Sequence, residues 1–234
     1  MTGLALSLLM LASAQPQSDM SARDTRLMIR TYGDCVVKRE SRRAAEAVVA
    51  NLGSTDLMRK YPQLIDGTCV PNVPRGQVVK VRFSGDQYRY ALADALVRAE
   101  LGSQTAPALD AVPRLSHREP PEPTRVTPNG KQLSERKYQE ALLDYQERRA
   151  FSVLSRYGEC VVRANPAAAR ALLLTEPESA DEAAQFAAMQ TALGTCVEQG
   201  QTISLAKLPL RGTIAVNYYR LARAAAGSNL KAAK

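Results

Sequence analysis

The chain has 234 residues, 45% of them hydrophobic, which is enough to bury the core of one large or two small domains. Aromatic residues make up only 5%, and the apolar set is mostly Ala and Leu, which favours helices over strands. The net charge of +8 bears on solubility and on attraction to anionic surfaces. Beyond the N-terminus, no segment stays apolar for the roughly 20 residues of a membrane-spanning helix, so the sequence predicts none.

The N-terminus has the pattern of an export signal. Residues 3–14 form a short apolar run that ends in Ala12-Ser13-Ala14, a small-x-small cleavage pattern, although no Lys or Arg precedes it. We therefore predict a signal peptide over 1–14 and a periplasmic or secreted protein. A buried N-terminal helix is the alternative, and cleavage after Ala14 stays open.

Two motifs occur twice. YGDCVV at 32–37 returns as YGECVV at 157–162, and GTCV at 67–70 returns at 194–197. The four cysteines all lie in these motifs, and four cysteines in an exported chain indicate two disulfides. Three pairings are conceivable. The repeat selects Cys35–Cys69 and Cys160–Cys196, because like units should be bonded alike.

The first half is predicted as helix, short helix, strand and helix. A helix covers 21–50, and a shorter one covers 55–66 with a break at Pro62. The alternating residues 77–83 predict a strand. A capping box at 84–87 then opens a helix that ends at Gly102.

The second half has a similar order with one more helix, and it follows a proline-rich linker over 103–131, which we expect to be an extended spacer or a strap along the surface. Helices are predicted at 132–163, 167–174 and 179–193, with a strand at 201–205 and a last helix from Pro209.

The predicted fold is mainly α, with two tandem disulfide-stapled helical repeats at 21–102 and 132–227. A pseudo-twofold axis relates them, and a basic tail follows at 228–234. Because a short strand cannot stand alone, 77–83 and 201–205 should pair into a two-stranded β element.

Catalytic signatures are lacking. His117, the only histidine, lies in the linker, where we expect it to be solvated, and each cysteine has a repeat partner. Without a CxxC or a histidine near the cysteines in sequence, no metal site or cofactor is predicted. Asp34 and Glu159 are equivalent acids that could form a shared site. We favour helix salt bridges to Lys38 and Arg163.

Gly33 and Gly158 occupy predicted helices, where glycine costs about 1 kcal/mol relative to alanine. We expect a neighbouring element to approach closely at each. A ligand against the glycine is the alternative.

Basic residues crowd one helix at Lys38, Arg39, Arg42 and Arg43, which we predict as a site for anionic surfaces. The alternative is a solvated helix face with nearby acids, as for the other basic clusters, Lys80, Arg82, Arg89 and Arg98, then Arg211, Arg220, Arg223 and Lys231. Exposed aromatics between basic residues and a recognised motif are both lacking, so nucleic acid is not an expected partner.

At the paired YG[DE]CVV and GTCV motifs the chain resembles uncharacterised exported bacterial proteins that carry the same tandem element. The resemblance covers residues 25–100 and 150–225. It implies an envelope location and brings no activity with it.

The sequence therefore predicts a non-enzymatic exported helical repeat protein, a binding or interaction module in the cell envelope. Its partner would be an envelope protein or an anionic envelope component. One alternative is an envelope hydrolase with a site between the repeats. Another is a structural homodimer formed through the 132–163 helix.

Overall fold

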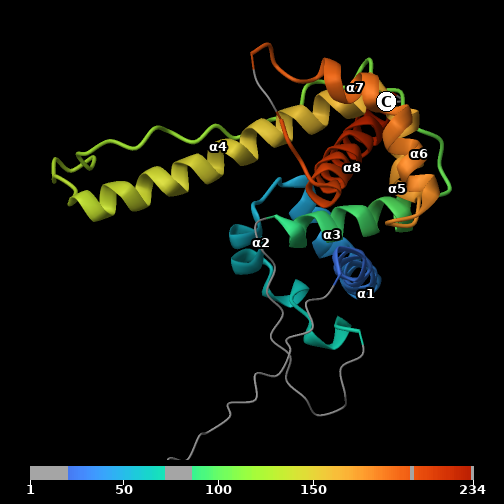
Figure 1. The fold of residues 1–234 in the computed structure, drawn as a ribbon, viewed down its shortest axis with the longest axis horizontal. Coiled ribbons are helices and arrows are strands. Elements are labelled where there is room, and N and C mark those ends of the chain that lie inside the picture. The colour runs from blue at the N-terminus through green and yellow to red at the C-terminus, as the bar shows by residue number, and fades with distance from the viewer. Residues whose placement is uncertain (1–20, 72–85, 201–202, 233–234) are drawn as a thin grey trace, which may run out of the picture.

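The computed structural model describes residues 21–71, 86–200 and 203–232, and these form a helical protein without a β-strand (Figure 1). An isolated antiparallel bridge joins Val126 to Gln132. The predicted signal peptide at 1–14 and strand at 77–83 lie outside the described residues. Of the second predicted strand, residues 203–205 are described and are not a strand.

Helices of the first half begin and end close to their predicted limits. Ser21 caps α1, accepting a hydrogen bond from the Asp24 N–H, and α1 bends at Glu40, whose backbone is non-helical. Pro62 separates the short α2 from a 3₁₀ turn, as predicted. The elements are α1 (Ala22–Val49), α2 (Ser54–Lys60), η1 (Pro62–Leu64), η2 (Gly67–Cys69), α3 (Gln87–Leu96) and the π-helical turn η3 (Val97–Leu101).

Helices of the second half also follow local signals. The Asn165 side chain caps α5 with Pro166 in its first turn, and the Ser179 side chain caps α6. One helix was predicted over 179–193, but a break at Met189 makes it two. Residues 228–232 of the predicted tail continue the last helix. The elements are α4 (Glu135–Ala164), α5 (Pro166–Leu174), α6 (Ala180–Ala188), α7 (Gln190–Thr195) and α8 (Lys207–Ala232).

Helix α8 is the centre of the fold. Its residues 211–222 are all buried, and it contacts α1, α3, α4 and α5 (Figure 1). Each predicted repeat contributes side chains to one continuous core, among them Val36, Leu92, Val161, Leu173 and Ile214. The two halves therefore share one core in the described structure.

The proline-rich segment is a strap and not a free spacer. Residues 103–134, here called the strap, run back along α4 (Figure 1). Leu109 and Val112 of the strap are buried, and the Arg163 guanidinium of α4 donates to their carbonyl oxygens at 3.1 Å each. The first half of α4 and the adjoining strap extend from the body as an arm.

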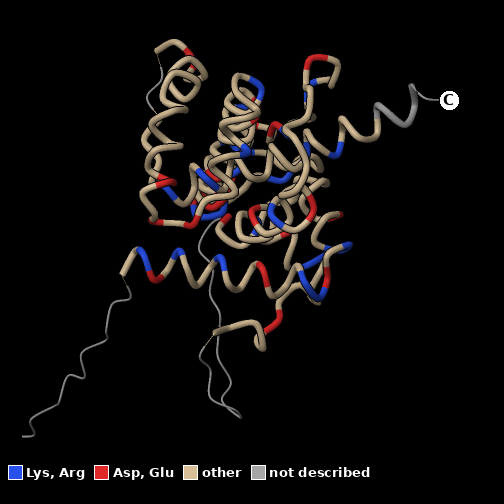
Figure 2. Tube along the Cα trace, turned by 90° about the vertical axis from the view of Figure 1, so that its right-hand side faces the viewer, with Lys and Arg blue, Asp and Glu red and all other residues tan. Residues whose placement is uncertain are grey.

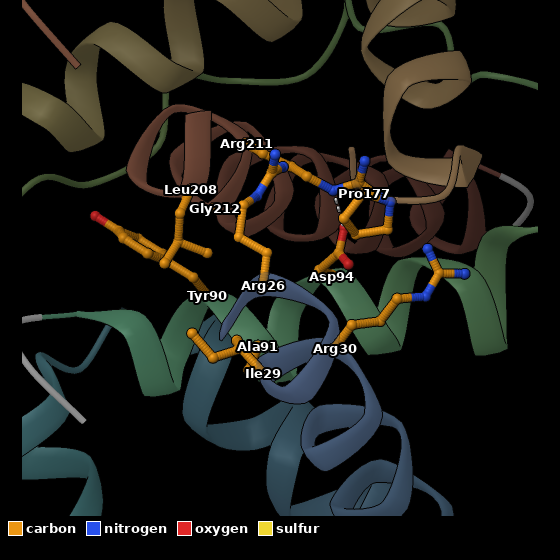
Figure 3. A pocket seen from close by; sticks show the side chains of 10 residues that line it. All are labelled: Arg26, Ile29, Arg30, Tyr90, Ala91, Asp94, Pro177, Leu208, Arg211 and Gly212. Atoms are coloured by element: carbon orange, nitrogen blue, oxygen red, sulfur yellow. Dashed lines mark hydrogen bonds and ion pairs between the residues drawn. The ribbon is translucent and has the colours of Figure 1, made fainter. Parts of the chain in front are cut away.

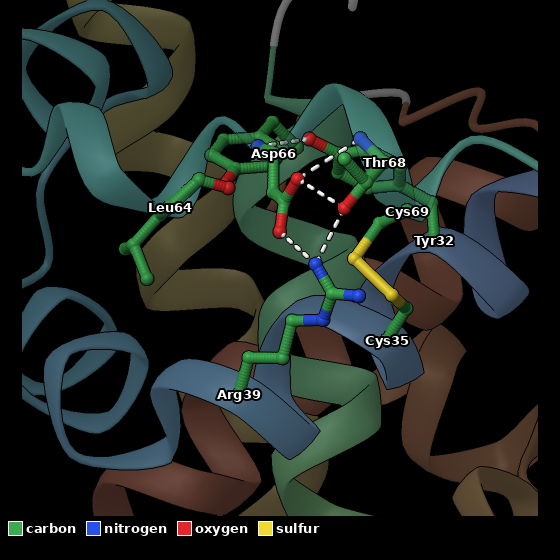
Figure 4. The surroundings of a disulfide bond; sticks show 8 residues. Tyr32, Cys35, Arg39, Leu64, Asp66, Thr68 and Cys69 are labelled. Carbon is green, nitrogen blue, oxygen red and sulfur yellow. Dashed lines mark hydrogen bonds and ion pairs between the residues drawn. A yellow bond between two sulfur atoms is a disulfide. The ribbon is translucent and has the colours of Figure 1, made fainter. Parts of the chain in front are cut away.

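Both disulfides have the predicted pairing. Cys35–Cys69 joins α1 to η2 with a Cα–Cα distance of 5.5 Å (Figure 4). Cys160–Cys196 joins α4 to the end of α7 with a Cα–Cα distance of 5.7 Å. Sequence separations of 34 and 36 residues correspond to a loop-entropy stabilisation of about 3–4 kcal/mol each.

Each disulfide stands beside a close helix crossing at a glycine. An added Cβ at Gly33 would lie 2.5 Å from the carbonyl oxygen of Ala91 in α3. One at Gly158 would lie 2.5 Å from Nδ2 of Asn217 and 2.8 Å from the carbonyl oxygen of Thr213 in α8. The expected close approach is confirmed at both glycines.

We predict that Gly158→Ala lowers the free energy of unfolding by about 1–3 kcal/mol, because the added methyl group forces α4 and α8 apart. Gly194→Ala in α7 is the matched control, since nothing lies within 4 Å of its Cβ position. Urea unfolding of the oxidised proteins measures both. Equal stability of the two variants would contradict the crossing as described.

Candidate functional site

A small cavity lies between α1, α3 and α8 (Figure 3). Arg26, Arg30 and Arg211 line it together with Asp94 and Tyr90. Its volume of about 20 Å³ is close to that of a single water probe. An organic ligand does not fit there.

The arginines at this cavity are already paired with acids. We call the cluster of Arg26, Arg211, Asp94 and Glu182 the Arg211 junction. Nε of Arg211 donates to Asp94 at 3.0 Å and its Nη1 to Glu182 at 3.0 Å. Nη2 of Arg26 donates to Glu182 at 2.5 Å. The remaining Arg211 bonds go to the carbonyl oxygens of Leu172, Leu173 and Thr175 and to the Thr175 hydroxyl. The junction joins α1, α3, α5, α6 and α8, and its role is structural.

Glu182 is the fully buried acid of this junction. Burial by itself would raise the pKa of Glu182. The hydrogen bonds from Arg26 and the Glu178 N–H, with the charges of Arg26 and Arg211, outweigh burial and hold the pKa below its ordinary value of 4.5. The carboxylate therefore stays ionised at neutral pH.

The two equivalent acids of the repeat do not share partners. Asp34 is 47% exposed and pairs with Arg98 at 2.5 Å and Arg30 at 3.9 Å, not with Lys38 as predicted. Glu159 is buried and accepts from Arg163 at 2.7 Å, which confirms that salt bridge.

His117 is held in a hydrogen-bonded cluster, so the expectation of a solvated histidine was wrong. Nε2 of His117 lies 2.5 Å from Oε2 of Glu159, and Nδ1 lies 3.0 Å from Oγ of Ser155. The other Glu159 oxygen also accepts from the Leu115 N–H at 3.0 Å. Burial would raise the pKa of Glu159, but these donors lower it overall. The cluster fastens the strap to α4.

Three of the four residues in the predicted basic cluster on α1 pair with acids. Arg39 bonds to Asp66 at 2.5 Å beside the disulfide (Figure 4), and Arg43 bonds to Glu40 at 2.5 Å. The bend of α1 at Glu40 lies within this cluster. Lys38 is exposed. Over the described chain, basic and acidic residues are interleaved (Figure 2).

Arg42 does border a larger hollow, which we call the α1–α8 groove. Its volume is about 610 Å³, within the range of small-molecule sites. Its walls come from α1, η3, the strap and α8. The residues that line it are Arg42, Ala45, Glu46, Val49, Glu100, Leu115, Arg220, Arg223 and Ala224.

Arg220 gives this groove an unmatched positive charge. The side chain is 7% exposed, and its Nη2 donates to the carbonyl oxygen of Ser116 at 3.0 Å. Its Nε and Nη1 are buried and have no hydrogen-bond partner among the described residues. Burial and the charge of Arg89 lower the pKa of Arg220 to about 10, with Glu159 opposing them. The guanidinium is thus protonated at neutral pH.

The interpretation of the later basic clusters as solvated faces was wrong for three arginines, whereas the side chain of Arg223 is 54% exposed. Arg89, Arg211 and Arg220 are buried, while Lys80 and Arg82 lie outside the described residues. A sequence signal existed for Arg220, since it stands between Tyr219 and Leu221 in a helix of small and apolar residues. Alone it does not distinguish a buried arginine from an exposed one.

In the described part of the chain, no group of three or more His, Cys, Asp or Glu side chains is arranged to hold a metal ion. Likewise, none of the helices described is both long and apolar enough to span a bilayer.

We predict that Glu182→Gln lowers the free energy of unfolding at pH 7 by about 3–5 kcal/mol, because it leaves two buried guanidinium groups undermatched. The wild-type protein should also lose stability as pH falls below 4.5, through the lowered pKa of folded Glu182, since the unfolded chain takes up the proton first. Exposed Glu147→Gln is the control. Urea titrations across pH measure this, and identical profiles for both variants would contradict it.

Comparisons with protein-family models, with curated proteins and with solved structures found no match to this chain. What the protein does must therefore follow from its own geometry. The described residues form a hollow of ligand size with an unmatched charge in its wall, the α1–α8 groove.

Proposed function

We propose that the chain is an exported, non-enzymatic binding protein of the cell envelope, and that the α1–α8 groove binds an anionic partner. The observation that carries this is the guanidinium of Arg220, buried in the groove wall with two nitrogen atoms lacking a partner among the described residues. Leaving a buried donor unmatched is unfavourable, and an anion in the groove would relieve it.

Two disulfides support the proposed location, because such bonds persist in oxidising compartments such as the periplasm. The predicted signal peptide over 1–14 agrees with export. We keep the periplasm, or secretion from the cell, as the proposed location.

Like contacts in the two halves support the proposed repeat at 21–102 and 132–227. Tyr32 Oη accepts from the N–H of Asp66, and Tyr157 Oη donates to the carbonyl oxygen of Leu193, each at 3.1 Å. In both cases the partner directly precedes a GTCV motif. With the glycine crossings and the disulfide pairing, these contacts support a correspondence of α1 with α4 and of α3 with α8. We propose a pseudo-twofold relation on this basis.

The hydrolase alternative now has a specific observation in the bonded set Ser155, His117 and Glu159, which contains a nucleophile, a base and an acid. The Ser155 side chain is only 2% exposed, however, and Glu159 is also bonded to Arg163. A substrate could reach Ser155 only if the strap came away from α4.

We therefore expect the wild-type protein to hydrolyse p-nitrophenyl esters no faster than Ser155→Ala does. Release of p-nitrophenol measures this directly. A rate at least about a hundredfold above that of Ser155→Ala would establish the hydrolase instead.

The homodimer alternative concerns the arm. Leu143 on α4 is 62% exposed and Val126 on the strap is 48% exposed. A dimer through the arm would cover them, and sedimentation velocity of wild type against Leu143→Glu distinguishes it from a monomer.

For the binding function we expect salt-sensitive association with phosphatidylglycerol vesicles or alginate, and none with phosphatidylcholine vesicles. Binding should fall steeply between about 0.05 M and about 0.5 M NaCl as screening increases. Val49→Asp in the groove should weaken it about fivefold, the effect of about 1 kcal/mol per charge. Val126→Asp is the matched control, since both valines are exposed. Sedimentation assays measure the bound fraction, and salt-insensitive or absent binding would contradict the proposal.

A further inference from the structure

We infer that the ligand of the α1–α8 groove is a single-chain amphiphile with one anionic head group, a carboxylate or a phosphate. This rests on the proposed function, because it takes the groove as the binding site, and it adds the class of ligand.

The charges around the groove specify the head group. Of the five charged residues in the lining, Arg42 lies 4.0 Å from Glu46, and Arg223 lies 3.8 Å from Glu100. Arg220 is left, so the groove has one positive charge in excess. One anionic group balances it, while a neutral head would leave it unmatched and a cation would be repelled.

The free nitrogen atoms of Arg220 fit oxygen acceptors. Nε and Nη1 carry three N–H donors between them, since guanidinium has five in all and Nη2 has the other two. Carboxylate and phosphate oxygens are the acceptors that match a planar guanidinium best, and such charge-assisted bonds are stronger than neutral ones.

The rest of the groove specifies an apolar body. Ala45 and Val49 of α1, Leu115 of the strap and Ala224 of α8 line it alongside the charged residues. The volume of about 610 Å³ far exceeds what an inorganic ion occupies. An acyl or alkyl chain covers these side chains and removes apolar surface from water.

The burial of Arg220 favours a slender ligand over a polymer. Because Arg220 is only 7% exposed, the end of a narrow molecule can approach its guanidinium more closely than the flank of a wide chain can. An acidic polysaccharide would contact Arg42, whose side chain is 85% exposed, more readily than it would contact Arg220.

The direct test is calorimetric titration of the full chain with decanoate and with decyl phosphate, each kept below its micelle concentration. We expect saturable binding of at least one of them at one molecule per chain. Which of the two binds identifies the head group. Four control compounds test each feature of the ligand: decanol lacks the charge, decyltrimethylammonium carries the opposite charge, and acetate and inorganic phosphate lack the chain. All four should bind at least about tenfold more weakly.

Two groove variants with matched controls locate the site. Arg220→Met removes the charge but keeps an unbranched side chain, and should weaken binding at least about tenfold without loss of folding. Arg148→Met on the arm is its control, because Arg148 is 60% exposed and pairs with Asp144 outside the groove. Val49→Asp should also weaken binding, whereas Val126→Asp should not. Because Val49 is 45% exposed, this variant decides the question even if Arg220→Met does not fold.

Absence of saturable binding by both anions would overturn the inference. So would binding that is unchanged in Val49→Asp, or decanol binding as tight as decanoate. If neither amphiphile binds but salt-sensitive binding to vesicles or alginate persists, the inferred class of ligand is wrong and the proposed function stands. If that binding is absent too, both fall.

Discussion

The arrangement of the helices depends on the guanidinium of Arg211 in the middle of α8. It donates to Asp94 on α3, to Glu182 on α6 and to carbonyl oxygens at the end of α5. Arg26 of α1 also donates to Glu182. A charge buried this deeply is costly unless it is paired and hydrogen-bonded, and the donors of Arg211 are all used. These hydrogen bonds have a direction and therefore fix the helices around α8 more specifically than apolar contacts, which have none.

Arg220 is the contrasting residue on the same helix. It is nearly as buried as Arg211, but its described partner is a single carbonyl oxygen, that of Ser116. Two arginines on one central helix thus have different roles. Arg211 holds helices together and all its N–H donors are used. Arg220 lies in the wall of the α1–α8 groove, and its Nε and Nη1 have no hydrogen-bond partner among the described residues.

The strap connects these features, since three consecutive residues serve the site. Leu115 lines the groove, Ser116 accepts from Arg220, and His117 is bonded to Glu159 and Ser155 on α4. A segment that reads as a linker is therefore part of the groove wall. The His117 cluster keeps it in place, which is a structural role.

Local physics determined much of this protein from sequence alone. Helix limits at Ser21, Pro62, Asn165 and Ser179 follow from capping and proline geometry within a few residues of chain. Duplication selected the cysteine pairing, and the cost of glycine in a helix pointed to the crossings at Gly33 and Gly158. What only the tertiary structure decided is the burial of Arg211 and Arg220, the bonding of His117 and the groove itself. Each depends on segments far apart in the chain, and neither periodicity nor composition specifies which distant carbonyl or carboxylate a side chain will meet.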